Sequence, residues 1–197
     1  MPSCRKPWDQ GVIFRPKTHI DRIEDDGNSV RLVMKGGGVI EAERIIVATN
    51  GYTSTLLPRL DVVPARGQVL LTAPIPDLEL RGTYHLDEGF YYFREHRGAV
   101  LLGGGRNLDI AGETTTEDGL SDRIQQALEQ LLRDVILPDQ PFTIAQRWSG
   151  IMGFGSESKS PIIERVSERV GVAVRLGGMG VAIGIRVARK AVEMMGR

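Results

Sequence analysis

The sequence predicts an α+β fold with mostly antiparallel strands, one long internal helix and a closing strand–turn–helix unit. Three observations support this prediction. Short alternating runs separated by turn residues occupy residues 18–42, as in a β-meander. Residues 62–154 combine strand-like runs with one helical pattern, which predicts a helix packed on an antiparallel sheet. Residues 170–195 have the pattern of a buried strand, a glycine turn and a helix.

The composition argues against several classes of protein. The 25 basic and 25 acidic side chains cancel, so neither nucleic acid nor an anionic membrane is expected as the main partner. No apolar run approaches the length of a membrane span, and the basic N-terminus lacks the apolar core of a signal peptide. We therefore expect a cytoplasmic protein. Cys4 is the single cysteine and the three histidines lie far apart, so neither an internal disulfide nor a metal site is expected.

The N-terminal region is expected to form a small antiparallel sheet. Turns rich in glycine separate three alternating runs, at residues 18–25, 29–35 and 39–42. Residues 11–15 form a further strand candidate ahead of this meander.

A nearly all-apolar run at residues 44–48 follows the meander and is typical of a strand buried on both faces. It ends in the polar, turn-forming cluster T-N-G-Y-T at residues 49–53. Open α/β sheets place ligands at the carboxyl ends of such strands. A plain loop explains the cluster equally well.

A single long helix is predicted for residues 116–136, which carry an apolar stripe at helical spacing. Thr116 and Gly119 give only a weak signal for its start, and Pro138 ends it. We expect the stripe to pack on the back of a sheet, and residues 142–148 to form a further strand. The stripe consists of Leu120, Ile124, Leu128, Leu131 and Val135.

The closing unit carries the main functional signal. Residues 170–176 form its strand and three glycines break that strand before a helix begins at Val181. The first amides of such a helix have no partner within it and favour an electron-rich group in the turn. The alternative is a tight corner without a ligand. The apolar residues at helical spacing in this helix are Val181, Ile185, Ala188, Val192 and Met195.

The same glycines resemble a dinucleotide-binding fingerprint through Gly178, Gly180 and Gly184. A Rossmann site also needs a later strand that carries an acidic residue for the ribose. No such strand follows this helix before Arg197, so a nicotinamide dinucleotide is not expected here.

An ordered set of motifs resembles the D-amino-acid oxidase, glycine oxidase and sarcosine oxidase superfamily of FAD-dependent oxidoreductases. In that superfamily a strand after the meander passes the cofactor, and a P-x-R-G-Q segment then enters the substrate domain. The matching segments are residues 41–58, 62–72, 90–94, 99–106, 147–154, 160–163 and 176–181.

The resemblance implies FAD as the cofactor and oxidation of a C–N bond in an amino acid or amine, by hydride transfer to the flavin. It also implies two domains. Residues 1–60 and 161–197 would form a partial FAD-binding domain, and residues 61–160 a substrate-binding α+β domain. The implied cofactor-binding residues are Ala48, Thr49, Asn50, Gly51, Gly150, Gly177, Gly178, Met179, Gly180 and Val181.

Three residues are candidates for the catalytic site: Arg66 at the domain crossing, and Tyr92 and Arg94 on the following hairpin. A surface position explains Arg66 equally well. Relatives of the glycine oxidase type bind the substrate carboxylate with an arginine in a G-x-R-P segment, and that position is Met152 here. Tyr92, Arg94 and Arg106 are candidates to replace that missing arginine. Arg147 and Trp148 either line the site or belong to the core.

The superfamily begins with a βαβ unit that carries G-x-G-x-x-G, and these residues contain none. We therefore expect a fragment, a truncated product or one half of a split enzyme. The strand at residues 45–48 would have an open edge, available to the missing half or to a second copy of the chain. The alternative is a non-catalytic remnant or subunit that binds FAD weakly or not at all and acts through association.

Overall fold

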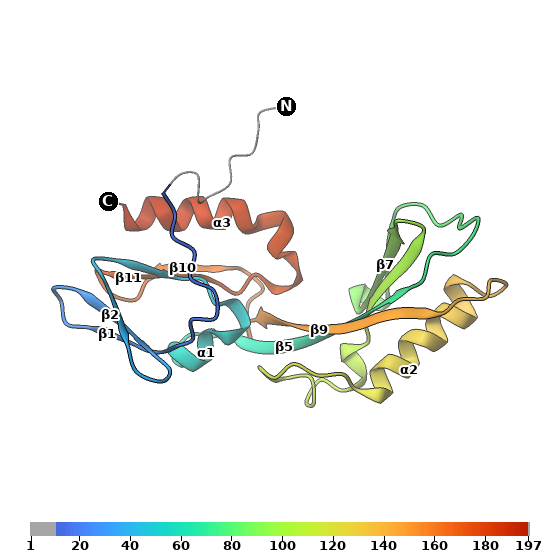
Figure 1. Cartoon of the computed structure of the whole chain (residues 1–197), viewed down its shortest axis with the longest axis horizontal. Coiled ribbons are helices and arrows are strands. Elements are labelled where there is room, and N and C mark those ends of the chain that lie inside the picture. The colour runs from blue at the N-terminus through green and yellow to red at the C-terminus, as the bar shows by residue number, and fades with distance from the viewer. Residues whose placement is uncertain (1–10, 197) are drawn as a thin grey trace, which may run out of the picture.

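The computed structural model describes residues 11–196, which form three sheets and two longer helices in an elongated arrangement (Figure 1). The observed mixture of helices and mainly antiparallel sheets confirms the predicted α+β class. Two small sheets lie beside the C-terminal helix, and a larger sheet with the internal helix lies at the other end. Cys4 falls outside the described residues.

The first sheet is the predicted meander, with strands in the order β1 (Ile20–Asp25), β2 (Val30–Met34) and β3 (Val39–Ala42). The Asp26 carboxylate closes the first turn by accepting hydrogen bonds from the amides of Asn28 and Ser29, both 2.8 Å long. The prediction of a strand at residues 11–15 is wrong. Among residues 11–196 no strand pairs with this short apolar run, and its side chains are exposed.

The second sheet has the order β10 (Ile162–Arg165), β11 (Val170–Val174), β4 (Ile45–Val47). Central β11 is antiparallel to β10 and parallel to β4, and all five of its residues are buried. Within the described residues β4 pairs with β11 alone, so its other edge is open as predicted. Burial of the β4 run on both faces is wrong, because the Ile46 side chain is exposed.

Helix α3 (Gly180–Met195) covers one face of this sheet and follows a single 3-10 turn, η6 (Gly177–Met179). It packs Val187, Ala191 and Met195 against the sheet. The other apolar positions of the predicted stripe face solvent, with Ile185 73% and Val192 62% exposed. The helix therefore carries an exposed apolar stripe next to its packed face, roughly a quarter of the way around the helix axis.

The third sheet is antiparallel throughout, with the order β6-β7-β8-β5-β9. Strand β9 runs on to Phe154, beyond the predicted end at residue 148. The predicted strand at residues 142–148 and the motif at residues 147–154 therefore belong to one strand. The short strand β6 was not predicted. The bounds are β5 (Val63–Thr72), β6 (Thr83–Leu86), β7 (Tyr91–His96), β8 (Ala99–Gly104) and β9 (Ile144–Phe154).

Helix α2 (Asp122–Leu131) packs on one face of this sheet, as predicted, and continues as a π-helical turn, η5 (Leu132–Ile136). It begins six residues later than predicted, so Leu120 precedes the helix and is 47% exposed. A π turn holds more residues than an α turn. Because of this extra residue, Leu132 is buried in the core, whereas Val135, a member of the predicted apolar stripe, is exposed.

The chain crosses between the small sheets and the large sheet twice, before β5 and after β9. The carboxylate of Asp61 links these two crossings. Asp61, in the first crossing, accepts hydrogen bonds from the amide and hydroxyl of Ser156, in the second, at 2.9 and 2.7 Å. Arg175, just before the glycine turn, forms an ion pair with Asp61 at 2.7 Å and donates to the carbonyl of Ser160. Helices η2 (Asn50–Tyr52) and α1 (Thr53–Leu56) precede the first crossing.

Within residues 11–196, no helix combines the length and apolar character that crossing a membrane requires.

We predict that Leu128→Ala lowers the free energy of unfolding by about 2–5 kcal/mol, because Leu128 is 0% exposed and its removal leaves a cavity under the sheet. Urea denaturation measures the change. The matched control is Leu120→Ala, a largely exposed leucine, which should cost no more than about 0.5 kcal/mol. Equal losses for the two variants would contradict this packing of α2.

Candidate functional site

The glycine turn before α3 is held by a hydrogen bond to Asn50 and lies close to the Phe154 ring. The amide of Leu176 donates to the side-chain oxygen of Asn50 over 3.0 Å. A Cβ atom on Gly177 would lie 3.4 Å from the ring of Phe154, at the end of β9. The structure therefore brings together two of the predicted cofactor-binding segments, residues 48–51 and residues 177–181.

The Asn50–Gly51 turn can form only because its residues suit a crowded corner. Asn50 has a φ of 44°, a left-handed conformation that asparagine tolerates better than most residues. Its carbonyl accepts a 2.6 Å hydrogen bond from the Thr53 hydroxyl. A Cβ atom on Gly51 would lie 2.5 Å from the Met152 carbonyl oxygen, so the turn packs directly on the β9 backbone.

Several of the predicted cofactor-binding residues present open backbone. A Cβ atom on Gly150 or Gly178 would meet no atom within 4 Å, and Met179 and Val181 are exposed. The α3 amides of the first turn, including that of Val181, have no acceptor inside the helix. The amide of Met179, an implied cofactor-binding residue, is not free, because it donates to the Leu176 carbonyl within the turn, over 3.0 Å.

The large sheet has one face covered by α2 and one face that we call the open face. A row of paired residues defines the open face: Tyr92 on β7, Gly103 on β8, Val69 on β5 and Trp148 on β9. Side chains alternate along a strand, so the neighbouring residues Gln68 and Leu70 point to the α2 side and are buried there. In Figure 1, α2 lies on one side of β5 and β9 only.

Tyr92 lies flat on the open face. A Cβ atom on Gly103 would lie 2.6 Å from three atoms of the Tyr92 side chain, so the glycine makes room for the ring. Burial raises the pKa of the Tyr92 hydroxyl, which keeps it protonated and able to donate a hydrogen bond. The ring of His85 on β6 lies 6.4 Å from the Tyr92 ring, centroid to centroid.

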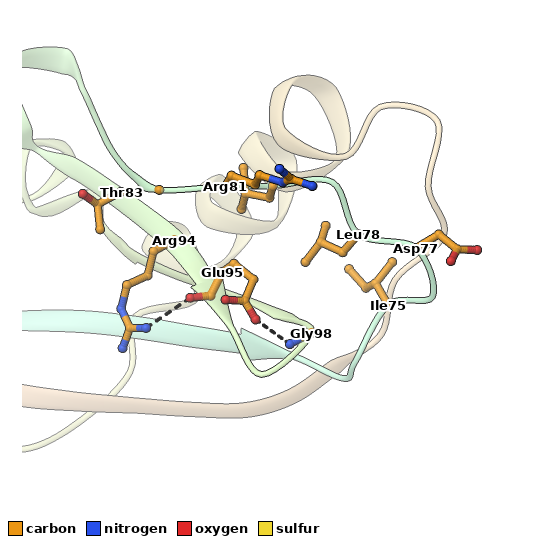
Figure 2. Close-up of a pocket in the computed structure, with 10 residues that line it drawn as sticks. Ile75, Asp77, Leu78, Arg81, Thr83, Arg94, Glu95 and Gly98 are labelled. Atoms are coloured by element: carbon orange, nitrogen blue, oxygen red, sulfur yellow. Dashed lines mark hydrogen bonds between the residues drawn. The ribbon is translucent and has the colours of Figure 1, made fainter.

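Arg94 is on the same face but far from the glycine turn. It lies in the strand row of Leu71, whereas Phe154 lies in the row of Val63. These rows are eight residues apart on β5, roughly 26 Å of strand. Arg94 instead lines a hollow of about 730 Å³ between β7 and residues 75–83, where it donates to the Glu95 carbonyl (Figure 2).

Arg66 points to the α2 side of the sheet, away from Tyr92 and Arg94. It forms a two-point ion pair with Glu113, with nitrogen–oxygen distances of 2.7 and 3.1 Å. The Glu113 side chain is 1% exposed, and its hydrogen bonds raise the pKa of Arg66. The structure thus assembles Tyr92 and Arg94 on one face and leaves Arg66 on the other.

Arg147 and Trp148, left open by the sequence, lie on opposite faces of β9. Arg147 donates to Gln125 at 2.6 Å and forms an ion pair with Glu129, both on α2. Trp148 is an exposed ring on the open face. Arg147 therefore binds the helix to the sheet, while Trp148 is available to a ligand.

The tie between Asp61, Ser156 and Arg175 was missed by the sequence reasoning. Hydrogen bonds from Ser156 lower the pKa of the Asp61 carboxyl, so it stays ionised as the partner of Arg175. The residues lie 95 and 114 positions from Asp61. The resemblance places both crossings at the domain boundary, and that is the one signal that could have paired them.

Residues 7–194 match the family model DAO, described as FAD dependent oxidoreductase. The chain belongs to this family. The match spans nearly the whole sequence and confirms the resemblance drawn from the motifs. The DAO family is FAD-dependent and includes enzymes that act on amino acids or amines.

A curated relative, the D-amino acid dehydrogenase of Bradyrhizobium diazoefficiens (strain JCM 10833 / BCRC 13528 / IAM 13628 / NBRC 14792 / USDA 110), is 29% identical over 146 residues, covering 72% of this chain and 34% of the relative. Glycine oxidase from Geobacillus kaustophilus has the same fold, with a TM-score of 0.76 and 20% identity, over 95% of this chain and 50% of that one. L-amino acid deaminase from Proteus vulgaris has a TM-score of 0.70 and 18% identity, over 95% of this chain and 48% of that one. The chain thus spans half or less of the length of these relatives.

We predict that Glu113→Gln lowers the free energy of unfolding by about 3–5 kcal/mol, because it leaves the largely buried Arg66 guanidinium without its counter-charge. Chemical denaturation at neutral pH measures this. The control is Glu24→Gln, which breaks the surface pairs with Arg22 and Arg31 and should cost about 0–1 kcal/mol. The idea fails if Glu24→Gln costs as much as Glu113→Gln.

Proposed function

We propose that this chain forms the flavin-ring and substrate side of an FAD-dependent oxidoreductase that oxidises a C–N bond of an amino acid or amine. The observation that carries the proposal is the position of the glycine turn. Its open backbone lies against Phe154 at the end of the open face, so one ligand can contact the turn while another lies on the sheet.

The residues present fit a flavin on chemical grounds. The turn of residues 177–181 would hold the electron-rich edge of the ring, because the first α3 amides and the helix dipole favour negative charge there. Residues 48–51 and Gly150 would supply further backbone contacts. The chemistry that bound FAD would supply is that of an acceptor for the hydride from the carbon that bears the nitrogen.

The chain's own side chains would position the substrate. The Tyr92 hydroxyl remains a donor at neutral pH, and Trp148 offers an apolar surface beside it in the same strand row. Oxidation of an amine over a flavin depends mainly on such positioning, since an oriented reactant avoids much of the entropic barrier. We propose that Arg94, which lines the hollow beside β7, guides the substrate as it enters. Arg66 would stabilise β5 from the α2 side through its ion pair with Glu113.

A dinucleotide-binding βαβ unit is the partner that we propose for the second sheet. The open edge of β4 accepts a further parallel strand, because β4 already runs parallel to β11. The exposed apolar face of α3 accepts a helix next to that strand. Such a unit would supply the pyrophosphate contacts that these 197 residues do not contain. A cytoplasmic location stays a prediction from the sequence.

A second candidate function is a non-catalytic subunit. The same β4 edge and α3 face favour it, because both are surfaces for association and neither needs a bound flavin. The two candidates differ in whether the chain binds FAD and in whether it oxidises amines.

We predict that the chain quenches FAD fluorescence saturably and that Gly178→Leu weakens this binding at least tenfold, about 1.4 kcal/mol. A Cβ atom on Gly178 would meet no atom within 4 Å, so the leucine side chain is expected to extend into the space offered to the ring. Gly184→Leu, on α3, where a Cβ atom also meets no atom within 4 Å, is the matched control and should change the affinity less than about twofold. A wild-type chain that quenches no FAD fluorescence favours the non-catalytic subunit.

We also predict that the chain associates through α3. Ile185→Asp should disrupt the assembly, because a charge in the apolar contact is costly, whereas Val135→Asp on the exposed side of η5 should not. Sedimentation of the wild type and both variants, alone and with a βαβ dinucleotide-binding unit, measures this. Self-association alone would point to a second copy as the occupant. A wild-type monomer that ignores the added unit would rule out the docking surface.

A further inference from the structure

Arg106 occupies an unusual place just beyond β8. Gly105, in a left-handed conformation with φ 76°, turns the chain out of the strand, and Arg106 begins a short 3-10 turn. Its guanidinium carbon lies 5.6 Å from the centroid of the Phe154 ring. One terminal nitrogen lies 3.5 Å from the hydroxyl of Thr114, a weak hydrogen bond.

The contact with Phe154 places this guanidinium on the open face. Trp148, Gly150, Met152 and Phe154 alternate along β9 and therefore share that face. The Phe154 ring also lies close to the glycine turn, since a Cβ atom on Gly177 would be 3.4 Å from it. Arg106 thus brings a positive charge to the junction between the glycine turn and the open face, the region that Arg94 is too distant to reach.

The Arg106 guanidinium forms no ion pair in the described part of the chain. Its Nε atom is buried and has no hydrogen-bond partner there, and none of the ion pairs formed by residues 11–196 includes it. The neighbouring Glu113 is occupied by the two-point pair with Arg66. Burial lowers the pKa of Arg106, against an opposing attraction from Glu113, yet a guanidinium stays charged at neutral pH.

A partly buried guanidinium without an ion-pair partner is unfavourable, and an anion from outside the chain would supply the missing partner. Carboxylate is the anion that its two-donor fork fits best. Met152, where the superfamily pattern leads us to expect the carboxylate-binding arginine, is two residues from Phe154 on the same face. Arg106 therefore reaches the region that Met152 leaves uncharged, from a different strand.

We propose that Arg106 binds the carboxylate of the substrate, so that the substrate is an amino acid and not a simple amine. This inference rests on the proposed function, since it concerns the same site. It assigns the specificity for the acid group to Arg106 and leaves Arg94 outside that contact.

The test follows the Nε–Hε correlation of Arg106 by NMR in the FAD-free full chain, identified by its loss in Arg106→Lys. The probes are benzoate and benzamide, which differ in charge and hardly in shape. We expect benzoate to shift the correlation saturably, with a Kd at least about tenfold below that of benzamide. The Nε–Hε correlation of Arg123, exposed on α2, should not move.

Variants separate recognition of the carboxylate from a merely structural role. With the Trp148 indole N–H as reporter, Arg106→Met should weaken benzoate binding at least about tenfold and leave benzamide unchanged. Arg106→Lys, which keeps the charge without the fork, should be intermediate. Arg123→Met should stay within about twofold of wild type. Loss of benzamide binding together with that of benzoate would indicate a damaged fold and overturn the assignment.

The outcomes also separate this inference from the proposed function. A chain that binds benzoate through Arg106 but no FAD supports the carboxylate site and refutes the flavin role. A chain that binds FAD while benzoate leaves Arg106 unmoved keeps the proposed function and overturns the inference. If FAD shifts the Arg106 correlation and benzoate does not, the anion belongs to the cofactor, and the carboxylate assignment is again wrong.

Discussion

The hydrogen bond from the Leu176 amide to the Asn50 side chain is the interaction on which the candidate site depends. It joins the end of β4 to the start of the glycine turn, two segments separated by more than half of the sequence. Gly51 then lets the same corner rest on the β9 backbone. The turn is thereby held against the sheet that carries Tyr92 and Trp148, so its amides and those side chains keep a fixed relation.

The two faces of the large sheet have separate tasks because α2 occupies only one of them. On the α2 side, the Gln125 side chain donates to the Gln68 side-chain oxygen and accepts from Arg147, and these hydrogen bonds hold the helix on the sheet. No helix covers the open face within the described residues, and glycines leave parts of it without side chains. Strand β5 pairs with both β8 and β9, so it runs between the glycine-turn end of this face and the end of β7 that carries Arg94.

Local patterns predicted the meander and the closing strand–turn–helix, because alternation and glycine turns are properties of neighbouring residues. The resemblance predicted the hairpin, and the motifs indicated the glycine turn of the candidate site. Three features depend on distant residues and escaped prediction: the exposed side of α3, the ion pair between Arg66 and Glu113, and the tie at Asp61. Alternation along β5 separates Arg66 from Val69, but it does not say which face α2 will cover.

The tie at Asp61 has a mechanical consequence. Both crossings between the small sheets and the large sheet are bonded to this carboxylate, and Arg175 adds the segment that leads into the glycine turn. A hinge motion that separated the small sheets from the large sheet would break an ion pair and several hydrogen bonds at once. The tie therefore favours a fixed angle between the small sheets and the large sheet.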